Sequence, residues 1–208
     1  MKIFSHAILF LSLCFYTITG NAETPEVVEG EAPSTLKTAV FAGGCFWCIE
    51  ADFEKLDGVV SVVSGYTGGE AETADYKTVT YYETGHFEAV QVSYEPSKVS
   101  YSELVEYFWR HIDPTNIRGQ FCDSGSSYLS AIFYANDEEK LIVANSLENL
   151  EKNKPFDGDI VTHIRAATPF YLAEEYHQDY YKKNPIRYNI YRRGCGRDKR
   201  VEQLWGEK

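Results

Sequence analysis

The sequence predicts an α+β fold, an α/β sandwich in which helices pack on a mixed central sheet. Helix-like and strand-like patterns alternate along the chain, and two strand-like patterns in the middle follow each other directly as a hairpin. The chain has 208 residues, of which 44% are hydrophobic, enough for one packed core. No internal repeat, low-complexity block or second domain boundary is visible.

The first half of the chain supplies most of the predicted strands. Gly43-Gly44 breaks an apolar run and predicts that a helix begins near Cys45, because apolar residues then recur at helical spacing up to Asp57-Gly58. The predicted strands are 37–42, 59–63, 77–83 and 87–94, with a Gly- and Thr-rich loop over 65–75.

The second half supplies most of the predicted helices. Ser100 and Glu103 form a capping-box pattern that opens a helix through Trp109. The other predicted elements are a polar loop over 113–127, a strand over 128–135, a helix over 136–152, a strand over 160–165 and a helix over 168–183. We expect the basic, Tyr-rich tail from Pro185 onward to be mobile.

The N-terminus resembles a secretory signal peptide over residues 1–22. Lys2 precedes an apolar run from Ala7 to Ile18, and the small residues Gly20 and Ala22 favour cleavage before Glu23. The alternative is an uncleaved membrane anchor, but the run is shorter than the roughly 20 residues of a comfortable span. We therefore expect an exported protein, periplasmic or secreted.

Residues 23–36 are rich in Glu and Pro and predict a flexible lead-in to a single catalytic domain over 37–208. The formal net charge is −11. Such a charge disfavours nucleic acid and anionic membrane surfaces, because both attract basic proteins. We expect neither as a partner after signal cleavage, and we expect a monomer.

Cys45 is a candidate reactive cysteine because it follows a strand and two glycines at the first turn of a helix. Unpaired backbone N–H groups and the helix dipole favour an anion there, so we expect the pKa of the thiol to fall. The alternative is a buried structural cysteine. Phe46 and Trp47 follow directly and can wall an apolar pocket or simply belong to the core.

Three further cysteines remain after signal cleavage. Cys48 forms a C-x-x-C pair with Cys45, the spacing of a redox pair. A zinc site needs a second close pair or nearby histidines, so we expect no metal. Cys195 lies between two glycines in the tail, as suits a thiol that swings to a sulfenic acid, or it pairs structurally with Cys122.

Glu88 shares its face of the 87–94 strand with Val90, Val92 and Tyr94. A carboxyl group on an apolar face is desolvated, which raises its pKa and keeps it protonated for proton donation near neutral pH. The alternative is a strand end at which Glu88 reaches solvent.

Six motifs together resemble the type A methionine sulfoxide reductase family, the peptide-methionine (S)-S-oxide reductases. They are GGCFWCIE at 43–50, GYTGG at 65–69, TGHFEAV at 84–90, DPT at 113–115, CDSGSSY at 122–128 and TPFYLAEEYHQDYY at 168–181. The resemblance covers about residues 37–205. It implies repair of methionine sulfoxide, free or in oxidised proteins, with specificity for the S epimer. No cofactor is implied beyond an external thioredoxin-like dithiol.

The resemblance also implies residue roles. Cys45 matches the nucleophile, and Glu88 matches the acid that protonates the sulfoxide oxygen. The remaining matches are Tyr76 and Tyr128 to the phenols that hold this oxygen, Asp123 to a supporting acid, and Phe46 and Trp47 to the walls that receive the methyl group.

The resolving thiol is left open between Cys48 and Cys195. Many family members have glycine at the position of Cys48 and two cysteines in the tail, so this chain departs from the commonest pattern at both places. We favour Cys195, because the tail is the family's usual resolving position. Two rival functions also remain at this point: general thiol–disulfide exchange through Cys45 and Cys48, and a binding domain with four structural cysteines.

Overall fold

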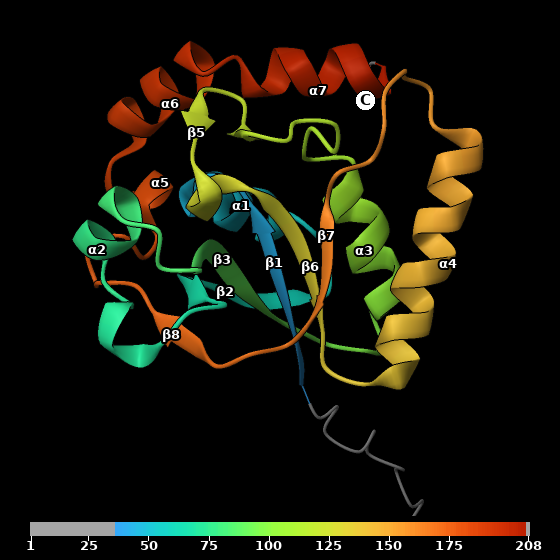
Figure 1. Cartoon of the computed structure of the whole chain (residues 1–208), viewed down its shortest axis with the longest axis horizontal. Helices are drawn as coiled ribbons and strands as arrows, with labels where there is room; N and C mark the ends of the chain where they lie inside the picture. The colour runs from blue at the N-terminus through green and yellow to red at the C-terminus, as the bar shows by residue number, and fades with distance from the viewer. Residues whose placement is uncertain (1–35, 207–208) are drawn as a thin grey trace, which may run out of the picture. The chain divides into compact units, whose positions relative to one another are not determined.

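A six-stranded mixed sheet forms the centre of the fold, with helices packed against it (Figure 1). The structure, a computed structural model, describes residues 36–206. The expected signal peptide at 1–22 and all but the last residue of the expected lead-in at 23–36 lie outside the described residues. Between 36 and 206, no helix is long and apolar enough to cross a membrane.

The main sheet has the strand order β7-β6-β1-β3-β2-β8. Only the pair of β6 with β7 is parallel; every other neighbouring pair in this sheet is antiparallel. The strands are β1 (Lys37–Gly43), β2 (Val59–Thr67), β3 (Phe87–Tyr94), β6 (Ser130–Tyr134), β7 (His163–Ala166) and β8 (Phe170–Leu172). The predicted mixed sheet and α+β class are therefore confirmed.

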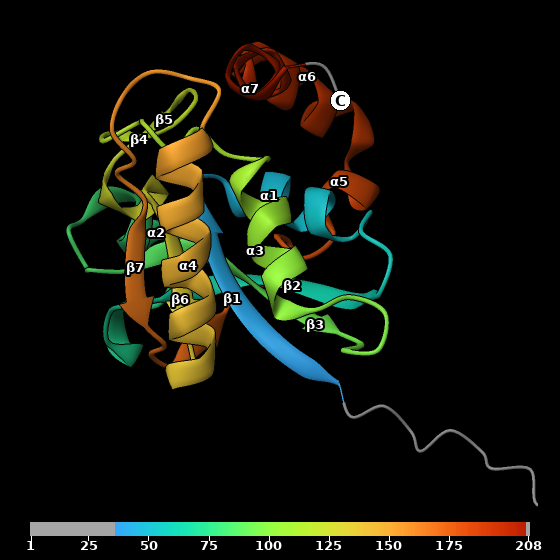
Figure 2. The same ribbon diagram turned by 90° about the vertical axis from the view of Figure 1, so that its right-hand side faces the viewer.

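The remaining elements surround this sheet. A small ribbon pairs β4 (Gly119–Gln120) with β5 (Asp123–Ser124). The α-helices are α1 (Phe46–Phe53), α2 (Tyr76–Tyr81), α3 (Tyr101–Trp109), α4 (Asp137–Asn153), α5 (Tyr180–Lys183), α6 (Pro185–Gly194) and α7 (Arg197–Trp205). Both views show α3 beside α4, and α7 at the end of the sheet near the β4–β5 ribbon (Figures 1 and 2).

The larger core lies between one face of the sheet and the helices α1, α3 and α4. Successive residues of β1 point to opposite faces, so Phe41 enters this core while Ala42 enters a smaller cluster on the other face. Phe41 stacks on Phe53 of α1 at 4.9 Å between ring centroids. The predicted capping box opens α3, with Ser100 and Glu103 hydrogen-bonded reciprocally.

The segment 77–83 is not the predicted strand, because Tyr76–Tyr81 forms helix α2. Its consecutive β-branched residues, Thr78, Val79 and Thr80, favour a strand, but side chains cap two N–H groups of the first helical turn. Asp75 accepts the N–H of Thr78, and Glu174 accepts the N–H of Tyr76. Strand β3 pairs antiparallel with β2, not with the segment 77–83.

The predicted helix over 168–183 is also wrong in its first part. Phe170–Leu172 adds β8 to the edge of β2, and only Tyr180–Lys183 is helical as α5. The side chain of Gln178 accepts the N–H of Ser64 and donates to its carbonyl oxygen, which holds the intervening turn against the sheet. Long-range pairing with β2 replaces the local helical hydrogen bonds.

The C-terminal segment differs from the expected mobile tail, since α6 and α7 pack against the rest of the fold. Val201 and Leu204 are buried, and so is the guanidinium-bearing side chain of Arg197. Arg192 of α6 forms a salt bridge with buried Asp52 of α1 at 3.0 Å. These contacts were hidden in a sequence that looks basic and polar.

Candidate active site

One pocket gathers side chains from helices, strands and loops that are distant in the sequence. Its lining residues are Cys45, Phe46, Trp47, Tyr76, Glu88, Asp123, Tyr128 and Tyr191. The cavity measures about 70 Å³, far below the roughly 300–1,000 Å³ of sites that enclose a drug-sized ligand. It therefore fits the end of a side chain better than a complete metabolite.

The turn before α1 presents Cys45 to this pocket. Gly44 has a φ of +78°, and a Cβ atom there would lie 2.5 Å from Cβ of Gln120. Gln120 is held in place because its amide bonds the backbone N–H and carbonyl oxygen of Asp113. A glycine is thus required both by backbone conformation and by space, and Cys45 becomes the N-cap of α1.

The expected fall in the pKa of Cys45 is wrong for the reduced pocket. Cys45 is 6% exposed, and burial raises the pKa of its thiol well above the ordinary value. The N–H of Phe46, in the first turn of α1, donates to Glu88 and is not directed at the sulfur. Desolvation therefore outweighs the helix N-terminus.

Cys48 lies one turn along α1 and is also buried and free. A hydrogen bond from the Cys45 thiol lowers the pKa of Cys48 to about 7, and Arg197 and Arg192 add to the effect against burial. Cys48 is therefore the more acidic thiol of the pair.

Glu88 of β3 is 2% exposed and lies on the same face as buried Val90 and Val92, as the alternation predicted. Its Oε2 accepts the N–H of Phe46 at 3.1 Å. Burial raises the pKa of Glu88 to about 8, and the nearby carboxylate of Asp123 raises it further against the hydrogen bonds from Phe46 and Tyr128. At neutral pH this carboxyl group is a proton donor.

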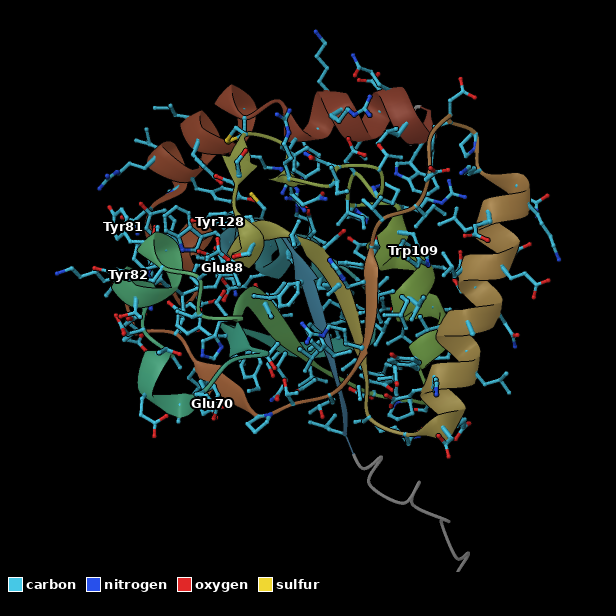
Figure 3. All side chains as sticks on the ribbon, viewed as in Figure 1. Glu70, Tyr81, Tyr82, Glu88, Trp109 and Tyr128 are labelled. Atoms are coloured by element: carbon cyan, nitrogen blue, oxygen red, sulfur yellow. A yellow bond between two sulfur atoms is a disulfide. The ribbon has the colours of Figure 1, made fainter. Side chains whose placement is uncertain are left out.

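Two phenols complete the polar side of the pocket. Tyr76 opens α2, and burial raises its pKa to about 12. Burial also raises the pKa of Tyr128, which hydrogen-bonds Glu88. Figure 3 shows Glu88 and Tyr128 close together beside α2, with Trp109 across the molecule on α3. Both phenols remain neutral hydrogen-bond donors at neutral pH.

The apolar wall is held by residues that lie between β8 and α6. Trp47 stacks on Tyr180 at 3.7 Å between ring centroids, and its Nε1–H donates to Nδ1 of His177 at 3.0 Å. Burial lowers the pKa of His177 to about 4, so the imidazole is neutral and can accept this bond. Phe46 packs beside the same histidine.

Cys195 does not lie free beside Cys45, because it forms a disulfide with Cys122. The sequence alternative of a structural pair with Cys122 is the arrangement present. Within 36–206, the metal-type donor atoms that cluster within 4.8 Å belong to Cys122, Asp123 and Cys195. Since the two sulfurs are bonded to each other, only one carboxylate remains to bind an ion.

Of the nine predicted site residues, seven line the pocket, Cys48 lies against it, and Cys195 is held in the disulfide. Sequence reasoning assigned no role to Tyr191, His177 or Tyr180. The last two lie in the quoted motif 168–181, which was a usable signal. Tyr191 had none, because a tail expected to be mobile gives no reason to place a phenol in the pocket.

A buried thiol pair beside a protonated carboxyl group and neutral phenols, with aromatic walls, defines a thiol-dependent oxidoreductase. The chain belongs to the peptide methionine sulfoxide reductase family, whose model matches residues 37–208. It is therefore an oxidoreductase that reduces methionine sulfoxide.

Relatives match over most of the chain. "Peptide methionine sulfoxide reductase MsrA" of Bacillus velezensis is 50% identical over 82% of this chain and 96% of its own length. "Peptide methionine sulfoxide reductase MsrA 2" of Caulobacter vibrioides is 48% identical over 84% of this chain and 88% of its own length.

Solved structures match the fold. Reduced Mxr1 from Saccharomyces cerevisiae has a TM-score of 0.69 at 34% identity, covering 74% of this chain and 89% of its own. Methionine sulfoxide reductase A of Corynebacterium diphtheriae has a TM-score of 0.65 at 31% identity, covering 75% of this chain and 78% of its own.

The raised pKa of Glu88 predicts a pH dependence for the reduction step. The carboxyl group is protonated below pH of about 8 and loses its proton as the pH rises through that value. The rate of methionine formation in a single turnover should therefore fall above pH 8. Glu88→Gln should lower the rate by about 10²–10⁴-fold, the usual range for a general acid, and should remove this alkaline fall.

Glu106→Gln is the matched control, because Glu106 accepts a hydrogen bond from Ser146 outside the pocket. It should keep the wild-type rate and profile. An alkaline fall that persists unchanged in Glu88→Gln would assign the titration to another group.

Proposed function

We propose that this enzyme reduces the S epimer of methionine sulfoxide, free or in oxidised proteins, with Cys45 as nucleophile and Glu88 as acid. The supporting observation is that both groups line one small pocket with Tyr76 and Tyr128. The Cys45 sulfur attacks the sulfoxide sulfur while Glu88 protonates the sulfoxide oxygen. The attack forms an S–S bond, which breaks as the protonated oxygen moves from the substrate sulfur to the Cys45 sulfur. Methionine leaves, and Cys45 becomes a sulfenic acid.

The remaining pocket residues orient the substrate. Tyr76 and Tyr128 donate hydrogen bonds to the sulfoxide oxygen. Asp123 supports the acid, because its negative charge raises the pKa of Glu88. Phe46 and Trp47 receive the methyl group, because aromatic faces make favourable contacts with a thioether. The small cavity selects the end of the side chain and leaves the backbone outside, which suits both free and peptide-bound substrate.

Cys48 is the resolving thiol in this proposal. It is free, hydrogen-bonded to Cys45 and the more acidic thiol of the pair, whereas Cys195 is bonded to Cys122. The Cys48 sulfur displaces water from the Cys45 sulfenic acid and forms the Cys45–Cys48 disulfide. This replaces Cys195, which the sequence favoured.

A thioredoxin-like dithiol then reduces this disulfide, and no prosthetic cofactor takes part. Support comes from Mxr1 of Saccharomyces cerevisiae, solved in complex with Trx2, with a TM-score of 0.50 at 27% identity. For an exported enzyme the donor is an exported thioredoxin-like protein, or the electrons are delivered through the membrane.

The activity is tested with separated S and R epimers and dithiothreitol as reductant. The S epimer alone should be consumed, and Cys45→Ser should abolish consumption because no nucleophile remains. Folded wild-type protein that reduces insulin disulfides and leaves both epimers untouched would instead indicate general thiol–disulfide exchange.

The resolving thiol is tested by one turnover without reductant, followed by peptide mapping. Cys48→Ser should stop at a Cys45 sulfenic acid that dimedone traps. The double variant Cys122→Ser/Cys195→Ser should still end as the Cys45–Cys48 disulfide. A Cys45–Cys195 bond in the wild type, or no Cys45–Cys48 bond in the double variant, would return the role to Cys195.

Export and a monomeric state are also proposed. The signal-like N-terminus supports export, and the origin of the whole pocket in one chain supports a monomer. Cell fractionation with N-terminal sequencing should give a periplasmic or secreted protein that begins at Glu23. Light scattering should give the mass of one chain. A cytoplasmic protein that retains Met1, or a stable dimer, would contradict the respective proposal.

A further inference from the structure

Tyr191 of α6 connects two groups of the pocket. Its hydroxyl group donates to Oδ2 of Asp123 at 2.5 Å, and its side chain lines the small pocket together with Cys45. The ring stands edge-on to Trp47, with centroids 5.8 Å apart and planes at 78°. A single phenol thus bridges the nucleophile and a carboxyl group.

The Cys122–Cys195 disulfide holds both ends of this bridge. Cys122 directly precedes Asp123, and Cys195 follows Tyr191 by one helical turn, with its N–H bonded to the Tyr191 carbonyl oxygen at 2.9 Å. The bond joins segments 73 residues apart. It fixes the loop that carries Asp123 against the helix that carries Tyr191.

Arg197 reinforces the same junction. Its guanidinium group lies 4.4 Å from the centroid of the Phe121 ring, next to Cys122. It also donates to the carbonyl oxygens of Gly43 and His111. Because Gly43 lies in the turn before Cys45, this buried arginine links the turn that carries Cys45 to the loop that carries Asp123.

Cys45 must lose a proton before it attacks, and few neighbours can take it. The titratable groups that face it are Cys48 on α1, Glu88 on β3, Tyr76 on α2, Tyr128, Asp123 and Tyr191. Glu88 already carries the proton that it delivers, and the phenols are neutral. Cys48 and Asp123 remain as acceptors.

Asp123 suits the role because it accepts the hydrogen bond of the Tyr191 hydroxyl group inside the pocket, and burial also raises the pKa of its carboxyl group. The other groups that act on it are Tyr191, Arg197 and Glu88. Tyr191 donates to Asp123 and lines the same small pocket as Cys45, so the phenol lies between the thiol and the carboxylate.

We propose that Tyr191 is a further catalytic residue, which relays the thiol proton of Cys45 to Asp123, and that the Cys122–Cys195 disulfide holds this relay in place. The S–H bond of Cys45 breaks as Oη of Tyr191 takes the proton, and the phenol's own proton passes to Oδ2 of Asp123. Tyr191 then donates to the Cys45 thiolate. Glu88 gives a separate proton to the sulfoxide oxygen, so charge and proton number balance.

This relay rests on the proposed function and is tested on its first step alone. The background is Cys48→Ser, which removes the competing acceptor and lets the Cys45 sulfenic acid accumulate with the Cys122–Cys195 disulfide intact. In that background, Tyr191→Phe should slow single-turnover methionine formation by about 10–100-fold, within or just below the range for proton-transfer groups. The alkylation of Cys45, measured by peptide mapping, should also shift to higher pH.

Asp123→Asn should produce the same two changes, and Tyr191→Phe/Asp123→Asn should be no slower than the slower single variant, because both residues act in one path. Tyr181→Phe is the matched control. Tyr181 also donates to a carboxylate, that of Glu54, but it does not line the pocket. It should retain the rate and the alkylation profile.

The disulfide is tested with Cys122→Ser/Cys195→Ser in the same background. This variant should shift both readouts in the direction of Tyr191→Phe, and adding Tyr191→Phe should cause little further loss. Wild-type rate and alkylation profile in Tyr191→Phe would overturn the relay, and the same result in the double serine variant would overturn the clamp. If the wild-type protein forms no methionine from the S epimer, the proposed function fails and not the relay. If the wild type forms methionine and the Cys48→Ser parent does not, Cys48 is the proton acceptor and the relay is overturned.

Discussion

The hydrogen bond from the Phe46 N–H to Glu88 is the contact on which the pocket depends. It joins the first turn of α1 to β3 inside the protein, where neither partner has water as an alternative. It sets the position of Cys45 relative to the acid. It also occupies the backbone donor that would otherwise stabilise a thiolate, so the charge on sulfur depends on side chains.

The side chains that supply this control come from two regions of the chain. Cys48 lies in α1. Its pKa is lowered by Arg192 and Arg197, which belong to the C-terminal segment. Tyr191 comes from that segment too. A part of the chain that follows the last strand therefore governs the protonation of cysteines near its beginning, and the Cys122–Cys195 disulfide fastens it there.

The residues between β8 and α6 build the substrate wall. His177 and Tyr180 fix the plane of Trp47 by a hydrogen bond and by stacking. Asp179 donates its N–H to buried Glu50 of α1. These contacts explain why the polar, tyrosine-rich end of the sequence is ordered: its tyrosines bury their rings while their hydroxyl groups bond carboxylates such as Glu54 and Asp123.

The sequence by itself determined the α+β class, the helix that begins after Cys45 and the strand face on which Glu88 lies, because each follows from local periodicity and turn chemistry. Its motifs also led to seven of the pocket residues. It misassigned 77–83 and the start of 168–183, where local preference for strand or helix gave way to Glu174 and to pairing with β2. Only the tertiary structure decided the pairing of Cys195 with Cys122, the entry of Tyr191 into the pocket and the raised pKa of Cys45. These depend on which distant groups meet and on how much water they exclude, and neither quantity is encoded in the spacing of residues along the chain.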